Sequence, residues 1–313
     1  MTHLIRPVDE ERDFPELAAM LDQVMTQGMT VAQLRTGAKS PAPLNRNMVA
    51  LNDEEAIVGW SLLRRSENEP ESRAFTSIIA HPHSRRNGIG SALLDDVVTH
   101  ARSIGVTALK SRVKDSEPGW LAWAKSKGFE IERHQFRSSV ALREFDDSPF
   151  MGRITELETA GIVFTTLAEL GDTNENRRRY YEADFKAAQD IPGEDYIESW
   201  PEYEVEVFGN EEYRPEGAYL ALDGDQIIGV AHVMLDSEHD RMENLFTGVL
   251  REYRGRGSAQ AMKLLTIKYA KQSGVSVILT ENDSENAPML AVNGKLGYKR
   301  WPGAYVLKAT LGQ

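Results

Sequence analysis

An internal repeat constrains this chain more than any other feature of its sequence. The run Arg-Arg-Asn-Gly-Ile-Gly at 85–90 has a counterpart 169 residues later, Arg-Gly-Arg-Gly-Ser-Ala at 254–259. The same offset relates Gly105 to Gly274 and Gly128 to Gly297. A period of this length is far too long for a solenoid, so the repeat predicts two consecutive copies of one domain.

Each run is predicted to join a strand to a helix. In the second copy, apolar residues between Leu245 and Leu250 precede the run, and a helical pattern follows from Ala259 to Ser273. A glycine-rich turn at such a junction presents successive backbone N–H groups and a helix N-terminus to an anion. Arg254 and Arg256 add positive charge. The turn therefore predicts a phosphate or diphosphate site, whereas a single copy could equally be a plain surface loop.

The run resembles Arg/Gln-x-x-Gly-x-Gly/Ala, the pyrophosphate loop of the GNAT superfamily of acetyl-CoA-dependent N-acetyltransferases. It lacks the Gly-Lys-Ser/Thr ending of a P-loop, and no G-x-G-x-x-G with a suitably placed acid is present. The resemblance implies the α/β (α+β mixed) class, with two GNAT-fold domains that each have a splayed mixed sheet flanked by helices. It also implies acetyl-CoA as cosubstrate. The cofactor-binding residues that it implies are Val249, Leu250, Arg254, Gly255, Arg256, Gly257, Ser258, Ala259 and Asn286 in the second copy, and Arg85, Arg86, Asn87, Gly88, Ile89 and Gly90 in the first.

Composition narrows the class of protein. The 313 residues suffice for two domains, and 41% hydrophobic with 27% charged residues is typical of a globular protein. The absence of cysteine excludes disulfides, thiolate metal sites and cysteine nucleophiles, and the seven histidines show no metal-ligand spacing. A net charge of −12 argues against a nucleic-acid partner. No run approaches the ~18 apolar residues of a membrane span, so we expect a cytoplasmic protein.

The predicted elements divide the chain into an N-terminal GNAT-like domain at 1–145, a linker at 146–159 and a C-terminal GNAT domain at 160–313. The linker lies in an acidic stretch, 144–159, that lacks periodicity. Strands are expected at 3–7, 48–51, 57–63, 75–80, 106–113, 129–132, 138–142, 162–167, 219–222, 227–235, 243–250 and 275–280, with a last pair within 299–311. Helices are expected at 13–25, around 94–101, and at 118–127, 174–188, 259–273 and 288–296.

Glu243 is the candidate general base. An acceptor amine must lose a proton to attack a thioester, which calls for a carboxylate or a relayed water. In the histone-acetyltransferase branch of the superfamily a glutamate lies on the strand before the loop, six residues ahead of a valine, and Glu243 and Val249 match this spacing. The same offset assigns Ala74 to this position in the first copy. Alternatively, Glu243 is an exposed strand residue without a catalytic role.

The resemblance leaves the general acid open. Many members carry an asparagine beside the CoA arm and, seven residues later, a tyrosine that protonates the departing thiolate. Asn286 matches the asparagine, but Asn293 stands at the tyrosine position. Tyr298, Tyr305 or a water are the remaining candidates, and Tyr298 could instead be a core aromatic.

The two copies are not equally equipped. The first has Glu117 and Ala124 where the second has Asn286 and Asn293. We therefore expect the second copy to be catalytic. The first either binds CoA at its retained loop or is a degenerate structural partner.

An acidic and aromatic segment precedes the predicted hairpin of the second copy, in a part of the GNAT fold that borders the acceptor cleft. Carboxylates mixed with aromatic faces attract cations, so the segment predicts a small cationic amine as acceptor, such as a polyamine, an aminoglycoside-like compound or a basic peptide end. A solvated acidic helix and loop is the alternative. The segment comprises Glu194, Asp195, Tyr196, Glu198, Trp200, Glu202, Tyr203, Glu204, Glu206, Glu211, Glu212, Tyr213 and Glu216.

The resemblance thus favours an enzyme that acetylates a primary amine by direct attack in a ternary complex. Two other functions stay open. One is a non-catalytic acyl-CoA-binding or sensing protein. The other is an activity like that of mycothiol synthase, a tandem member of similar length that acetylates an amine on a cysteine-containing pseudodisaccharide.

Overall fold

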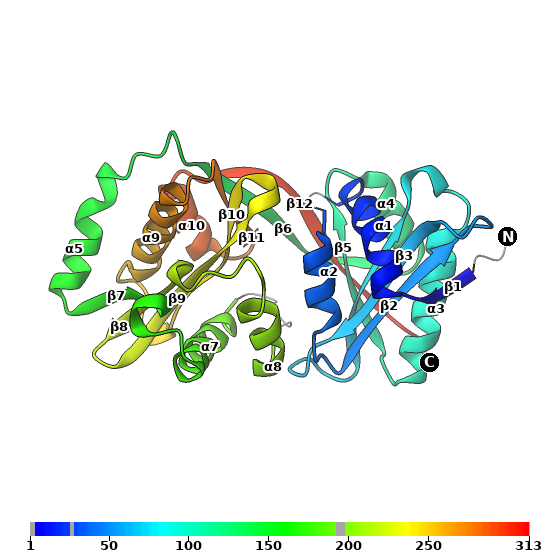
Figure 1. Ribbon diagram of the computed structural model, residues 1–313, viewed down its shortest axis with the longest axis horizontal. Helices are drawn as coiled ribbons and strands as arrows, with labels where there is room; N and C mark the ends of the chain where they lie inside the picture. The colour runs from blue at the N-terminus through cyan, green and yellow to red at the C-terminus, as the bar shows by residue number, and fades with distance from the viewer. Residues whose placement is uncertain (1–3, 26–27, 192–197, 313) are drawn as a thin grey trace. The chain divides into compact units, whose positions relative to one another are not determined.

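The computed structural model describes residues 4–25, 28–191 and 198–312, which form two compact units. The first unit contains the described residues up to Glu132, the segment Pro201–Glu211 and the end of the chain from Tyr305. The second contains Arg133–Trp200 and Glu212–Ala304. Each unit is a sheet with helices on both faces (Figure 1).

The first unit has the sheet order β1-β2-β3-β4-β5-β12. Strands β1 to β4 are antiparallel, whereas β4 and β5 are parallel. Its elements are β1 (Leu4–Pro7), α1 (Glu10–Asp22), α2 (Val31–Ala38), β2 (Leu44–Leu51), β3 (Ile57–Arg65), β4 (Arg73–Ala80), α3 (Ile89–Ser103), β5 (Ala108–Lys114), α4 (Pro118–Ser126) and the last residues of β12 (Lys299–Thr310).

The buried residues of β2 and β3 belong to separate cores on the two faces of the sheet. On one face, Leu17 and Leu21 of α1 pack with Val49 and Trp60. The other face carries α3 and α4, where Leu94 and Val97 belong to a second cluster, together with Leu63, Leu109 and Ala124. Side chains of successive strand residues point to opposite faces, so each strand contributes to both cores.

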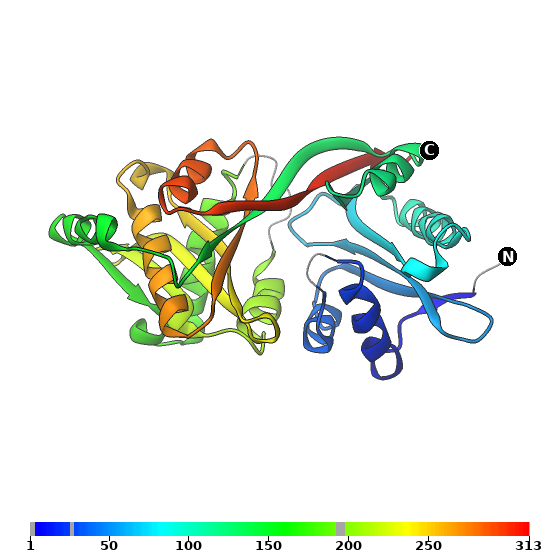
Figure 2. The same ribbon diagram turned by 90° about the horizontal axis from the view of Figure 1, so that it is seen from above.

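The second unit repeats this plan in the order β6-β11-β10-β9-β8-β7. Helix α9 covers one face of its sheet and α7 the other (Figures 1 and 2). Its elements are β6 (Glu130–Ala141), α5 (Met151–Thr159), β7 (Ile162–Thr166), α6 (Leu167–Leu170), α7 (Asn174–Ala188), β8 (Ala218–Asp223), β9 (Gln226–Asp236), β10 (Arg241–Val249), α9 (Ser258–Gln272), β11 (Val277–Asp283), α10 (Ala287–Lys295) and β12; the short α8 (Trp200–Tyr203) lies where the two units meet in the sequence.

Glycines related by the 169-residue offset adopt the same backbone conformation. Gly105 and Gly274 follow α3 and α9 with φ values of +80° and +81°, and Gly128 and Gly297 follow α4 and α10 with +87° and +75°. Glycine ends helices in this left-handed region because it has no Cβ to clash with the preceding turn. The glycines that recur in the sequence therefore end corresponding helices in the two units.

Several regions differ from the predicted elements. Helix α2 was not predicted, because only Leu34 of its eight residues is fully buried and no apolar periodicity marks it; a capping box from Thr30 to Gln33 starts it. Residues 130–141 form one strand instead of two, and so do 299–310. Residues Met151–Thr159 of the expected linker form α5, whose Leu157 is buried against the core of the second unit.

The last strand of each sequence copy belongs to the opposite unit. Residues 135–141 of β6 pair with β11, whereas Leu307 and Ala309 of β12 lie in the core around Leu109. Leu311 N–H also donates to Thr107 O at 2.7 Å. We propose the boundaries 1–145, 146–159 and 160–313 for the repeated sequence units. The compact units differ from these boundaries, because each contains the last strand of the other repeat.

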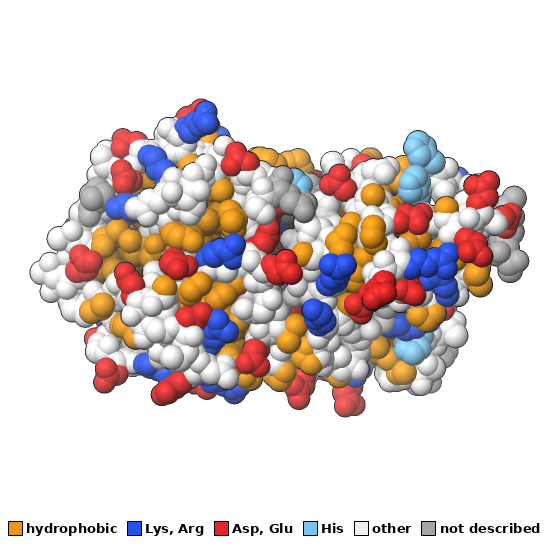
Figure 3. Space-filling view, viewed as in Figure 1, with side chains coloured by type: hydrophobic (Ala, Val, Ile, Leu, Met, Phe, Trp, Pro, Cys, Tyr) orange, Lys and Arg blue, Asp and Glu red, His pale blue; other side chains and the backbone are white. Residues whose placement is uncertain are grey.

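No helix in the described part of the chain combines the length and the apolar character needed to cross a bilayer. On the face drawn in Figure 3, acidic and basic side chains of the described residues are interspersed rather than gathered into a basic stripe.

We predict that Leu307→Ala destabilises the first unit, although Leu307 lies in the second sequence repeat. Its side chain is fully buried, so truncation is expected to cost about 2–5 kcal/mol. Hydrogen exchange should accelerate in β5 and α3 and stay unchanged in β10 and β11. Acceleration confined to the second unit would contradict the exchange of last strands.

Candidate active site

The glycine-rich turn of the second copy leaves the N-terminus of α9 open to an anion. Gly255 and Gly257 have φ values of +78° and +96°, and Gly257 is the N-cap, so no side chain caps the helix. Ala261 N–H donates to the carbonyl of the N-cap Gly257 at 3.0 Å. The amides that precede Ala261 in the first turn therefore have no helical acceptors. Such amides and the helix dipole favour a phosphate.

An unpaired hydroxyl in this turn also suits a bound diphosphate. The hydroxyl of Ser258 is buried and has no hydrogen-bond partner among the described residues. A buried polar atom without a partner costs free energy, which a bound phosphate oxygen would recover. Arg254 is fixed by Nε donation to Val249 O at 2.8 Å and by an ion pair with Asp190 at 2.8 Å. Ala259 follows Ser258 as the second residue of the helix.

Two more arginines, Arg256 and Arg153, lie beside the turn. The sequence pattern indicated Arg256 but not Arg153. The guanidinium of Arg256 lies 5.2 Å from the ring centroid of Tyr253. Arg153 of α5 approaches the turn so closely that its Cδ would lie 3.0 Å from a Cβ added at Gly257. Sequence reasoning missed Arg153 because it lies about a hundred residues away in the predicted linker. Both side chains add positive charge beside the N-terminus of α9.

The first copy has the same turn geometry. Arg86 and Gly88 have φ values of +67° and +84°, matching Gly255 and Gly257, and Arg85 Nε donates to Ala80 O at 3.4 Å. Helix α3 begins at Ile89, followed by Gly90, and like α9 it has 15 residues and an N-cap glycine. Asn87 completes the turn. The fold therefore preserves both loops, although their sequences share few residues.

The parallel strands β10 and β11 part beside the turn. They pair from Arg241 and Val277 to Asn244 and Thr280, and no further. On the other edge of β10 the register with β9 shifts between Asn244 and Phe246, so that Leu245 forms a β-bulge. A bulge bends the strand and re-aims its side chains, which is why bulges are common next to active sites.

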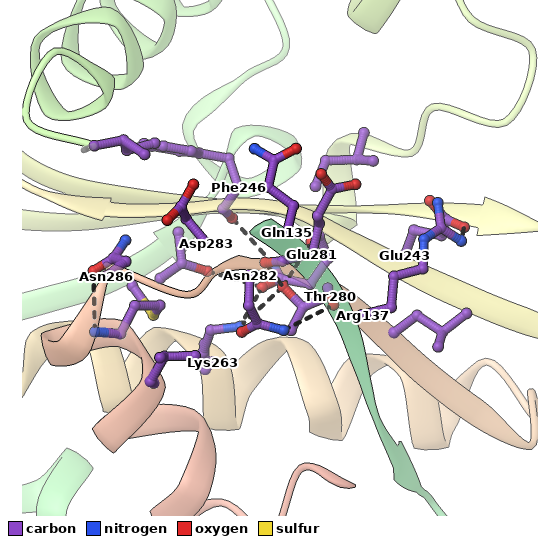
Figure 4. Close-up of a pocket in the computed structure, with 17 residues that line it drawn as sticks. Gln135, Arg137, Glu243, Phe246, Lys263, Thr280, Glu281, Asn282, Asp283 and Asn286 are labelled. Atoms are coloured by element: carbon purple, nitrogen blue, oxygen red, sulfur yellow. Dashed lines mark hydrogen bonds and ion pairs between the residues drawn. The ribbon is translucent and has the colours of Figure 1, made fainter. Parts of the chain in front are cut away.

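A pocket occupies the parting of these strands (Figure 4). It is lined from β10, β11, β6, α9 and α10, all within the second unit. Its ionisable side chains are Arg137, Glu243, Lys263, Glu281 and Asp283, and the other polar ones are Gln135, Asn244, Thr247, Thr280, Asn282 and Asn286.

Glu243 lies at this pocket, as Figure 4 shows. Its side chain is 23% exposed and its Oε1 lies 3.4 Å from Arg137 Nη1 and 3.8 Å from Arg241 Nε. Glu243 pairs with Met234, and Phe75 pairs with Arg64 at the matching point of the first unit. Its structural counterpart is thus Phe75, not Ala74 as the constant offset predicted, because the bulge at Leu245 inserts one residue.

The two asparagines of the second copy have different positions. Asn286 caps α10, with its Oδ1 accepting from Met289 N–H at 3.3 Å, and it lines the pocket. Asn293, at the tyrosine position, is buried and donates to Asn282 Oδ1 at 2.6 Å. Asn293 is thus a structural neighbour of the pocket wall rather than part of it.

Val249 and Leu250 lie between the pocket and the turn. Val249 O accepts from Arg254, and Leu250 N–H donates to Ile228 O at 2.9 Å. These two backbone groups are therefore engaged inside the protein, and neither residue is among those that line the pocket.

Lys263 is a pocket residue that sequence reasoning missed. It is 1% exposed, and its Nζ donates to Asn244 Oδ1 at 2.7 Å and lies 3.5 Å from Thr280 Oγ1. Thr247 Oγ1 donates to the same Asn244 Oδ1 at 3.0 Å. Burial lowers the pKa of Lys263 to about 7. A lysine inside a helical pattern usually lies at the surface, so no local signal marked this one.

Tyr298 is buried beneath this lysine. The Nζ of Lys263 lies 4.9 Å from its ring centroid, and burial raises the pKa of its phenol well above the ordinary value. Its hydroxyl makes no hydrogen bond with the described residues, and it is not part of the pocket wall. This position favours the core aromatic over the general acid.

The pattern of the acetyltransferase (GNAT) family matches residues 16–129 and 185–298, which again lie 169 residues apart and together cover more than half of the chain. The chain belongs to the acetyltransferase (GNAT) family. Its two copies are two GNAT domains in tandem, as the repeat predicted, and members of this family use acetyl-CoA as cosubstrate.

Several known proteins are similar over nearly the whole of this chain. A mycothiol acetyltransferase of Thermobifida fusca (strain YX) is 22% identical over 301 residues, which are 93% of this chain and 88% of that one. A solved tandem GNAT protein from the clavulanic acid biosynthesis pathway has a TM-score of 0.77 at 19% identity, with coverage of 100% and 99%. The GCN5-related glucosamine N-acetyltransferase region of a fungal multi-domain GH3 beta-N-acetylglucosaminidase has a TM-score of 0.74 at 16% identity; this chain is covered to 98% but spans only 38% of that chain. The structural likenesses show the fold alone.

The acidic segment of this GNAT protein does not line the pocket in its described part. Glu206 is held by Arg64 and by Ser40 Oγ at 2.6 Å, and buried Glu202 accepts from Ser66 Oγ, all within the first unit. Glu194, Asp195 and Tyr196 lie outside the described residues. Glu202 and Glu206 thus fit neither predicted alternative, because they are paired inside the protein.

Metal ligation is not supported by the described residues, which contain no group of three or more His, Cys, Asp or Glu side chains able to hold an ion.

We predict that the left-handed second position of each loop controls local stability. Arg86→Gly should raise the free energy of unfolding of the first unit by about 1 kcal/mol, because a non-glycine residue is strained at φ +67°. Gly255→Ala should lower that of the second unit by about 1 kcal/mol; nothing lies within 4 Å of the added Cβ, so only the backbone conformation is tested. Thermal unfolding of both variants measures the effect, and a lower melting temperature for Arg86→Gly would contradict it.

Proposed function

We propose that the second GNAT domain transfers an acetyl group from acetyl-CoA to a primary amine, by direct attack in a ternary complex. The observation that carries the proposal is the pocket at the parting of β10 and β11, next to the amide-lined turn that opens α9. The turn suits the diphosphate, and the parting of two strands suits a narrow arm that carries the thioester. The site and the anion-binding turn lie in one unit.

The second domain, rather than the first, is proposed as the catalytic one. At the positions of Asn244, Lys263 and Glu243 the first domain has Thr76, Leu94 and Phe75. Leu94 belongs to a hydrophobic cluster of the first unit. The first domain retains an anion-binding loop, so binding of CoA there without turnover is part of the proposal.

Glu243 is proposed to remove the proton from the acceptor amine, directly or through a water. Its carboxylate lines the pocket and is 23% exposed, so an acceptor can reach it. Arg137 and Arg241 lie on one side of its Oε1 and keep the carboxylate oriented. The amine nitrogen then forms a bond to the acetyl carbon, and the bond from that carbon to sulfur breaks.

A small cationic amine is the proposed acceptor. Three carboxylates and two cationic side chains line the pocket, so a positively charged group is favoured over a negative one. The curated relatives named mycothiol acetyltransferases support a second candidate, the amine of a cysteine-containing pseudodisaccharide. Initial rates with spermidine, an aminoglycoside and this pseudodisaccharide amine decide between them.

A third possibility, an acyl-CoA-binding protein without turnover, predicts CoA binding with no rate for any amine. A cytoplasmic location stays part of the proposal.

We predict that reversing charge in the two loops has different consequences. Arg254→Glu should weaken binding of CoA at the second domain by about 10- to 100-fold, because a charge-assisted contact is lost, and should abolish turnover. Arg85→Glu should leave turnover unchanged. Isothermal calorimetry with CoA and thiol release from acetyl-CoA measure both, and the reverse pattern would assign catalysis to the first domain.

Glu243→Gln is expected to lower kcat on the order of 10²- to 10⁴-fold, because general base catalysis contributes this much. The dissociation constant of CoA should not change, since the turn is untouched. Glu285→Gln is a matched control, because Glu285 is exposed and does not line the pocket. A fully active Glu243→Gln enzyme would show that another group accepts the proton.

A further inference from the structure

The structure contains a buried ammonium group in the pocket of the second domain that the proposed function does not use. Lys263 extends from α9 into the parting of β10 and β11, where Figure 4 shows its nitrogen directed at the polar groups of both strands. Its hydrogen bond to Asn244 Oδ1 is 2.7 Å long. Asn244 in turn is held by donation of its amide to His232 O and Phe246 O, each at 3.1 Å. The ammonium is thus fixed in position by the bulged strand.

The fold itself does not require a lysine at this place. The residue at the same position of α3 in the first domain is Leu94, packed in a hydrophobic cluster. Burying an amine costs free energy that leucine would not cost, and hydrogen bonds only partly offset it. A buried charge that the architecture can replace by an apolar residue indicates a functional constraint on the second domain.

We propose that the ammonium of Lys263 donates a proton to the sulfur of CoA as the acetyl group leaves. This inference rests on the proposed function. The amine nitrogen bonds to the acetyl carbon, the carbon–sulfur bond breaks with its electron pair on sulfur, and a proton moves from Nζ to sulfur. Glu243 receives the proton that the amine loses. The products are the acetamide and the CoA thiol, and solvent returns the proton to Lys263 and takes that on Glu243.

Lys263 is the pocket residue suited to this role. Among the described residues that line the pocket, the other ionisable side chains are Arg137, Glu243, Glu281 and Asp283. A guanidinium does not release its proton near neutral pH, and ionised carboxylates have none to give. Asp283 is moreover paired with Arg133 at 3.1 Å.

The surroundings of the ammonium also set its acidity. Desolvation lowers the pKa of Lys263 to about 7, whereas an ordinary thiol has a pKa of about 8.5. Transfer of the proton from nitrogen to a thiolate is therefore downhill. The π face of Tyr298, 4.9 Å from Nζ, interacts favourably with the cationic form before the proton leaves. Tyr298 itself keeps its proton and acts only as a neighbour of the lysine.

The first experiment needs no acceptor. CoA bound to the protein is titrated with alkali, and the ultraviolet absorbance of its thiolate is recorded for the wild type, Lys263→Leu and Lys263→Arg. The inference expects the bound thiol to ionise at lower pH than free CoA in Lys263→Arg, where a permanent cation replaces the ammonium, but not in Lys263→Leu or in the wild type, whose lysine loses its proton before the thiol ionises. Calorimetry should give the same dissociation constant for CoA in all three.

The two outcomes against the inference are distinct. If the thiol bound to Lys263→Arg ionises as in free CoA, or if Lys263→Leu shows the same shift, the side chain at 263 does not face the sulfur, so the proton donor is not Lys263 and the proposed function survives. If CoA does not bind the wild type at all, the proposed function fails as well. Lys263→Leu is expected to fold because the first domain carries leucine at this place; if it does not, Lys263→Met and Lys263→Arg replace it.

Measurements of turnover distinguish a residue that donates a proton from one that only supplies positive charge. With an amine that the wild type acetylates, kcat should fall on the order of 10²- to 10⁴-fold in both Lys263→Leu and Lys263→Arg, because neither can donate a proton near neutral pH. The wild type should lose activity as pH rises above the pKa of Lys263, and neither variant should show this loss. Full activity of Lys263→Arg would assign the residue a structural charge instead.

Discussion

The parting of two parallel strands is the constraint on which the rest of the second domain depends. Four residue pairs join β10 to β11, and beyond Asn244 and Thr280 the strands diverge. Backbone and side-chain groups that a continuous sheet would cover are thereby turned toward a pocket. The bulge at Leu245 lies at the point of divergence and explains why polar side chains from β10 face that pocket. The amide-lined turn then follows the end of the same strand.

The two domains keep the same loop geometry, whereas the side chains around the loop differ. Both turns have left-handed second and fourth residues and an N-cap glycine before a 15-residue helix. The first domain nevertheless fills the places of Glu243 and Lys263 with Phe75 and Leu94. At the place of Met289, which lines the pocket, it has Trp120, stacked under Arg85 at 4.8 Å. The geometry of the turn is therefore independent of the side chains that we propose for catalysis.

The sequence predicted those features that arise from residues close together in the chain. It missed those that arise from residues far apart in the chain. Helix Asn174–Ala188 begins and ends where it was predicted, and Thr173 caps its start. The turns were predicted because glycine spacing is a local signal. Lys263, Arg153 and Arg137 were missed as site residues, since their roles arise from strands and helices distant in the sequence. The bulge at Leu245 was invisible to a constant offset, which is why Ala74 was taken for the counterpart of Glu243.

Folding during synthesis is shaped by the position of Leu307 and Ala309. These residues belong to the core of the first unit, yet they are translated after strands β7 to β11 of the second unit. The first unit, although most of it is translated earlier, cannot complete its sheet until β12 has been synthesised. Its unfinished edge beside β5 is exposed throughout translation of the second domain, so a nascent chain of this kind depends on chaperones or on rapid elongation to avoid pairing with a neighbour.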